Sequence, residues 1–238
     1  MHVYQDQELC LLRLGELRFL YPDVDVLVIL DGVHAPELEA YCTAARINLH
    51  KGRRLKESPQ WIVRFLRLFL ATSQAEHLIK IDPDTKLLKP LQFLGSGDVF
   101  GTMHRQNSWA YINGGAMGFR RSAATKLLQS GILDNPRYCQ EAFRYNRWLP
   151  PYLATSEQRR LDRVIASDLI LSDAARSIGL ECADWPEVLC CASHLQLCEK
   201  LKSVSLESLS AIHPVKNADN WISQIQPAQV DRFPKGSI

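Results

Sequence analysis

The stretch that decides the fold is His77-Leu78-Ile79-Lys80-Ile81-Asp82-Pro83-Asp84. Its first five residues are mostly apolar and end abruptly at two carboxylates, which is typical of a buried strand that ends at a ligand-binding edge. Pro83 biases Asp82 toward an extended conformation, so we expect the carboxylates at i and i+2 on one side of the chain. Carboxylates held this close repel, and their hard oxygens favour Mg²⁺ or Mn²⁺ as the remedy. The alternative is a surface turn, because Asp-Pro-Asp is also good turn chemistry.

Helix and strand patterns alternate on both sides of this strand. The sequence predicts helices over residues 7–20, 36–45, 59–69, 122–130 and 167–178, and strands over 24–30, 77–81, 98–102 and 116–119. A turn at Asn113-Gly114-Gly115 precedes the last of these strands. The alternation predicts one α/β domain over residues 1–226, with a mostly parallel central sheet flanked by helices and a polar tail at 227–238.

Composition excludes several classes of protein. The 238 residues are 46% hydrophobic and 23% charged, which excludes disorder, collagen and coiled coil for the whole chain. The 28 basic and 26 acidic side chains leave a net charge of +2, so we expect no nucleic-acid partner. Seven cysteines without a CxxC pair favour reduced thiols and a cytoplasmic protein. We expect no signal peptide and no transmembrane segment, whereas peripheral membrane contact stays open.

Five segments resemble, in order along the chain, the nucleotide-sugar glycosyltransferases of the GT-A fold. The segment Ile79 to Thr85 looks like their DXD motif, and Tyr111 to Phe119 is similar to their glycine-rich segment. The other three are residues 21–32, Ser167-Asp168 at a helix start, and Ala211-Ile212-His213-Pro214. The order is closest to the Fringe-like inverting branch. The chain departs from that branch at Pro83, where a third acidic residue is usual, and at Ser167, where a second carboxylate is common.

The resemblance implies a metal-dependent transfer of a sugar from a nucleotide-diphosphate sugar to a hydroxyl acceptor, which is a sugar, a lipid-linked glycan or a protein. It implies a single GT-A-like (Rossmann-like) domain with a nucleotide-binding half at about 1–100 and an acceptor half at about 101–226. A Mn²⁺ or Mg²⁺ ion would be held by Asp82, Asp84 and His213. Asp168 would be the base of an inverting reaction, and the donor would meet Asp31, Lys80, Asp82, Asn113, Gly114 and Gly115.

Each of these residues also has a plainer interpretation. Asp168 could be an ordinary carboxylate at a helix start, and His213 a structural histidine. Lys80, the connector 51–56 and the arginines at 64 and 67 could meet a diphosphate or form a solvated basic face. The aromatic residues of 138–152, with Trp109, could stack on an acceptor or form a satellite core. The rival functions are a nucleotidyltransferase and a non-catalytic nucleotide-sugar-binding module.

Overall fold

The first sheet is parallel, as the sequence predicts. The computed structural model describes residues 1–55, 59–92, 95–106, 109–135, 138 and 166–215. The strands β1 (His2–Val3), β2 (Leu27–Asp31) and β3 (Asn48–Gly52) pair in the order β1-β2-β3. Helices α1 (Gln7–Leu20) and α2 (Pro36–Ala44) bury their apolar residues against this sheet. The carboxyl ends of all three strands therefore point to one edge.

The second sheet is mixed, which corrects the prediction of a mostly parallel arrangement. Its order is β4 (His77–Ile81), β7 (Trp109–Arg120), β6 (Val99–Gln106) and β8 (Cys182–Asp184). β7 is antiparallel to both β4 and β6, and only β8 is parallel to its neighbour β6. Strands β6 and β7 are separated by two residues, and a connection this short can join only antiparallel strands.

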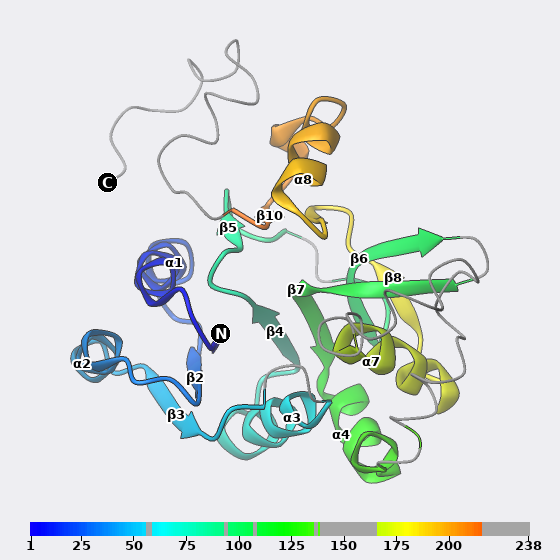
Figure 1. Ribbon diagram of the computed structural model, residues 1–238, viewed down its shortest axis with the longest axis horizontal. Coiled ribbons are helices and arrows are strands. Elements are labelled where there is room, and N and C mark those ends of the chain that lie inside the picture. The colour runs from blue at the N-terminus through cyan, green and yellow to red at the C-terminus, as the bar shows by residue number, and fades with distance from the viewer. Residues whose placement is uncertain (56–58, 93–94, 107–108, 136–137, 139–165, 216–238) are drawn as a thin grey trace, which may run out of the picture.

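Four helical elements make the main core with this sheet. They are α3 (Gln60–Thr72), α4 (Arg121–Ser130), the short 3₁₀ helix η1 (Ile132–Asp134) and α7 (Ala166–Ser177). α3 contributes Trp61, Phe65 and Phe69, and Phe65 stacks on Trp61 at a centroid distance of 5.2 Å. α3 and α4 lie side by side (Figure 1). α4 ends where Gly131 adopts a φ of 64°, which is the left-handed conformation that glycine tolerates best.

A third, small sheet joins distant parts of the chain. It has the order β5 (Lys86–Leu87), β10 (Ala211–His213) and β9 (Val188–Cys190), and it packs with α8 (His194–Leu201) and the 3₁₀ helix η3 (Leu206–Ser208). β10 is antiparallel to β5 and parallel to β9. Because β5 begins just after the Asp-Pro-Asp turn, this pairing brings the end of β10 next to that turn.

A cavity of about 580 Å³ separates the first sheet from β4. Its lining is mostly apolar and includes Leu27 and Ile29 of β2, Phe65 and Phe69 of α3, and Ile79 of β4. Figure 1 shows the amino terminus between β2 and β4. Within the described residues, β4 pairs only with β7, so its other edge is turned toward this cavity.

The helices that the structure describes include none with the length and apolar character needed to cross a bilayer. The predicted polar tail at 227–238 lies outside the described residues.

Candidate functional site

The turn that follows β4 holds both predicted carboxylates. The backbone N–H of Asp82 donates to the Gly115 carbonyl at 2.8 Å, and the N–H of Thr85 donates to the Asp82 carbonyl at 2.9 Å. The buried Thr85 hydroxyl also donates to the Gly115 carbonyl, at 2.8 Å. The segment is thus a closed turn, as one interpretation of the sequence had it, and buried hydrogen bonds fix the turn to β7.

β10 brings His213 to this turn. The N–H of Val215 donates to the Asp84 carbonyl at 2.7 Å, which ties the two segments together. The His213 Nδ1 lies 3.2 Å from Asp84 Oδ1 and 3.3 Å from the Thr85 hydroxyl oxygen. Since Nδ1 faces two oxygens, the neutral ring keeps its proton there and leaves a lone pair on Nε2.

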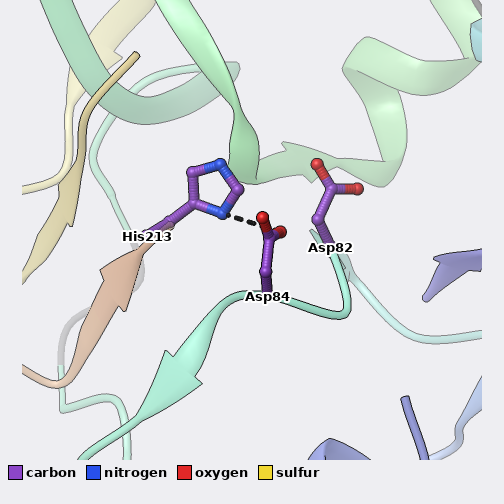
Figure 2. A group of neighbouring side chains, drawn as sticks. All are labelled: Asp82, Asp84 and His213. Atoms are coloured by element: carbon purple, nitrogen blue, oxygen red, sulfur yellow. Dashed lines mark ion pairs between the residues drawn. The ribbon is translucent and has the colours of Figure 1, made fainter. Parts of the chain in front are cut away.

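Asp82, Asp84 and His213 form one cluster, in agreement with the metal-ligand set that the resemblance implies. Each offers a ligand atom, and these atoms lie within 4.8 Å of one another. The side chains of Asp84 and His213 are each 13% exposed, and that of Asp82 is 24% exposed. Figure 2 shows the imidazole beside the Asp84 carboxylate, with Asp82 across from them. Ligands about 2.1 Å from Mg²⁺ or Mn²⁺ are roughly 3–4 Å apart, so small side-chain adjustments would let this donor set hold either ion.

The predicted turn at 113–115 is wrong, because these residues lie inside β7 as an irregularity of the sheet. Gly101 pairs with Met117 and Met103 pairs with Ile112, so residues 113–116 lie opposite Thr102 alone. The Asn113 side-chain oxygen accepts the N–H of Gly115 at 2.9 Å, which closes the irregularity locally. Asn113-Gly114-Gly115 does interrupt the regular strand pairing, but it forms a bulge within a continuing strand and not a turn between two strands.

The two glycines of this bulge make room for other residues of the site. A Cβ on Gly114 would overlap the Asp168 carboxylate, and a Cβ on Gly115 would overlap the His213 ring. The sequence interpretation was that a sugar approaches these glycines. In the structure the groups that approach them are the predicted base and the predicted metal ligand, so glycine is required for the site to assemble.

Asp168 lies in the first turn of α7 and faces the bulge. Its Oδ2 accepts the Gly114 N–H at 2.8 Å. The Ser172 hydroxyl accepts the Ile112 N–H at 3.0 Å, which fastens α7 to β7 beside the carboxylate. Burial raises the pKa of Asp168, although the nearby Lys80 ammonium opposes that shift. The carboxylate is therefore a stronger base than an ordinary aspartate.

The Lys80 ammonium places a positive charge inside the site. Lys80 is 6% exposed, and its Nζ lies 2.6 Å from Asp82 Oδ1. The ammonium also donates to the Gly114 carbonyl and lies 5.2 Å from the centroid of the Trp61 ring. Lys80 is thus buried and does not form part of a solvated basic face, while its contact with a diphosphate stays a prediction.

Asp31 belongs to a separate cluster at the carboxyl end of β2. It is fully buried, and Oδ1 accepts from Arg64 at 2.5 Å and from the Leu55 N–H at 2.7 Å. Burial raises the pKa of Asp31, but the neighbouring His2 ring, the Arg64 guanidinium and the Leu55 amide outweigh it and hold the pKa well below its ordinary range. Oδ2 lies 3.6 Å from His2 Nε2 and has no hydrogen-bond partner among the described residues.

Two of the other basic residues singled out in the sequence are paired with acids. Lys51 lies 2.5 Å from Glu39, and Arg67 lies 2.9 Å from Asp134. Of the aromatic segment 138–152, only Tyr138 is among the described residues, and its hydroxyl donates to Asp173. The role proposed for that segment as an acceptor site therefore stays a prediction.

Thr85 is the site residue that sequence reasoning missed. The signal was a small hydroxyl residue directly after the second aspartate, at a position that the pairing of β5 with β10 makes fully buried. Comparison with known proteins finds no family model that matches this chain and no curated protein that matches it.

Proposed function

We propose that the protein is a metal-dependent glycosyltransferase that moves a sugar from a nucleotide-diphosphate sugar to a hydroxyl acceptor. The observation that supports this most is the convergence of three separate segments on the bulge of β7. The turn after β4 is bonded to Gly115 through the Asp82 N–H, the end of β10 brings His213 to Gly115, and the start of α7 brings Asp168 to Gly114. Asp84 joins the group through its contact with His213. A purely structural role would not require two acidic side chains, an imidazole and a third carboxylate with a raised pKa to lie this close together, whereas ligand binding would.

Asp84, His213 and the free oxygen of Asp82 would hold the divalent cation. Bound there, Mn²⁺ or Mg²⁺ would neutralise negative charge on a leaving diphosphate. The protein's contribution is to keep these ligands in place through the buried bonds of Thr85 and Val215. The neutral His213 ring is the form that can bind a metal.

Asp168 would accept the proton of the acceptor hydroxyl. The Gly114 N–H fixes its orientation, and its raised pKa makes proton acceptance more favourable than for an exposed aspartate. This role applies if the reaction inverts configuration. Asn113, Gly114 and Gly115 would then border the donor sugar, and Asp31 would act at the nucleoside end through Arg64 and the Leu55 segment that it holds.

The cellular setting belongs to the same proposal. The six cysteines that the structure describes are free thiols, and burial raises the pKa of Cys10 and Cys190 to about 12. Buried thiols such as these two are poorly reactive, which supports the proposal of a reducing, cytoplasmic compartment.

The test is a panel of nucleotide sugars incubated with Mn²⁺ and simple hydroxyl acceptors, with transfer and donor hydrolysis followed by chromatography. We expect turnover with at least one donor, and a loss of about 100-fold or more in Asp84→Asn. Glu199→Gln, which removes an exposed carboxylate of α8, is the matched control and should keep full turnover. Binding of donors without any turnover would instead identify a binding module. Pyrophosphate-dependent chemistry would identify a nucleotidyltransferase.

A further inference from the structure

The site already contains a cation of its own. Lys80 is the second-last residue of β4, opposite Met117 of β7, and is almost completely buried. Burying an ammonium without partners would cost several kcal/mol of folding free energy, so the groups around Lys80 must stabilise its charge. They come from three elements: Asp82 in the turn after β4, the Gly114 carbonyl in β7, and the Trp61 ring in α3.

Gly114 is held at both of its polar backbone atoms. Its N–H donates to Asp168, and its carbonyl accepts from Lys80. Lys80 is therefore connected through one glycine to the proposed base, and through one carboxylate to the proposed metal ligands.

The backbone of Asp82 is held by groups other than Lys80. Its N–H donates to the Gly115 carbonyl and its carbonyl accepts from the Thr85 N–H, while Pro83 restricts the backbone of Asp82 to extended conformations. Removal of the ammonium would leave this backbone in place and release Oδ1 of the carboxylate. We therefore expect the charge of Lys80 to change the affinity for a cation more than the loss of its hydrogen bond would by moving Asp82.

We propose that Lys80 is a built-in counter-ion that competes with the divalent cation for Asp82 and so limits the metal affinity of the site. This rests on the function proposed above. Because Nζ lies 2.6 Å from Asp82 Oδ1, any ion that shares this carboxylate lies within a few ångströms of a fixed positive charge. When the metal is absent, the ammonium satisfies Asp82 and prevents repulsion between the two aspartates from opening the turn.

The magnitude follows from Coulomb's law at the edge of a protein. A unit charge this close to a divalent ion changes the binding constant by far more than tenfold before solvent screening, so we expect an observable change of about tenfold or more. Loss of a group that orients a metal ligand would instead weaken metal binding, by about 10-fold to 100-fold. Because backbone hydrogen bonds hold Asp82, we expect this loss of affinity to be small here.

The experiment is calorimetric titration of the full chain with Mn²⁺ alone, alongside thermal unfolding of each variant. Lys80→Met removes the charge and keeps the side chain's length and apolar stem. Lys80→Arg keeps the charge, and Lys202→Met removes an exposed lysine that pairs with Glu199. We expect Lys80→Met to bind Mn²⁺ about tenfold or more tightly than the wild type, and the other two variants to stay within about threefold of it. Lys80→Gln provides the same loss of charge if Lys80→Met does not fold.

Equal or weaker Mn²⁺ binding by a folded, uncharged variant overturns the proposal, because a merely structural lysine would change the unfolding temperature and not raise the metal affinity. The failure of the proposed function gives a different pattern. In that case neither the wild type nor Asp84→Asn would bind Mn²⁺. If the wild type binds, Asp84→Asn does not, and the loss of the Lys80 charge has no effect, then only the role of Lys80 is refuted.

Discussion

Asp168 shows how one side chain acquires a function from its neighbours. Its carboxylate is placed against backbone, because Gly114 has no side chain to keep it away. The hydrogen bond from Gly114 orients it, and burial raises its pKa. The same aspartate at an exposed helix start would only stabilise the helix dipole. The bulge of β7 is therefore the feature that favours a chemical role for Asp168.

Asp168→Asn should reduce sugar transfer by about 100-fold or more, since proton transfer by a positioned base contributes roughly that much. The amide oxygen can still accept the Gly114 N–H, so we expect folding and Mn²⁺ binding to be kept. Asp173→Asn on the same helix is the matched control. Similar rates for the two variants would contradict the assignment.

The pH profile provides an independent test of the same residue. The base must be deprotonated, so the wild-type rate should fall as the pH falls through the raised pKa of Asp168. The acidic limb should thus lie above the ordinary aspartate value of about 3.9. A limb at the ordinary value, or one that persists in Asp168→Asn, would assign the titration to another group.

At the scale of elements, the Asp31–Arg64 pair joins β2, α3 and the segment at Leu55. Asp31 is fully buried, whereas the Arg64 side chain is 13% exposed. Removing the arginine would leave a buried carboxylate with one fewer partner. Because the pKa of Asp31 is lowered in the folded state, the pair's stabilisation is present above about pH 4 and is lost as the pH falls further.

Arg64→Met should therefore lower the free energy of unfolding at pH 7 by about 3 kcal/mol, measured by urea denaturation. Arg67→Met is the control on the same helix, because Arg67 is 63% exposed in its pair with Asp134 and should contribute about 0–1 kcal/mol. At a pH well below 4 the difference between Arg64→Met and the wild type should shrink. Equal costs for the two arginines would show that the buried pair has no special role.

The sequence predicts elements well where several signals agree. Helix 7–20 and strand 77–81 have the predicted bounds, because apolar spacing and the breakers Tyr21-Pro22 and Asp82-Pro83 indicate the same ends. The strands β9 and β10 have three residues each, too few for a period, and depend on pairing between distant segments. The bulge at 113–116 depends on the partners β4 and β6, so local turn chemistry could not reveal it. The cluster of Asp82, Asp84 and His213 was thus predictable, but not the buried Thr85 or the contacts that hold the cluster together.

At the scale of the whole molecule, the cavity between the first sheet and β4 lies beside Met1 and β2 and could hold an extended segment. The Met1 N–H group donates to the Leu27 carbonyl at 2.6 Å, and the Met1 carbonyl accepts from Ile29 at 2.9 Å. These are the bonds of a strand residue parallel to β2. Burial lowers the pKa of the Met1 ammonium to about 6, so the cavity disfavours the charged form.

A variant with three β-branched residues joined to Met1 should therefore be more stable, by about 1–3 kcal/mol from added apolar burial net of ordering. The new peptide N–H keeps the bond to Leu27 and removes the buried charge. The wild type should lose stability as the pH falls from about 8 through 6, and the extended variant should not lose it in that range. An extension of serine and aspartate is the control in thermal unfolding. Equal unfolding temperatures for both extensions would contradict a strand-shaped cavity.

The central claim is that Asp82, Asp84 and His213 hold a divalent cation. The most direct test is electron paramagnetic resonance of free Mn²⁺ during titration with the protein. We predict that the wild type takes up one Mn²⁺ per chain, that Asp84→Asn weakens this uptake by about tenfold or more, and that Glu199→Gln leaves it unchanged. Uptake that is equal in the wild type and Asp84→Asn, or absent from the wild type, would contradict the account.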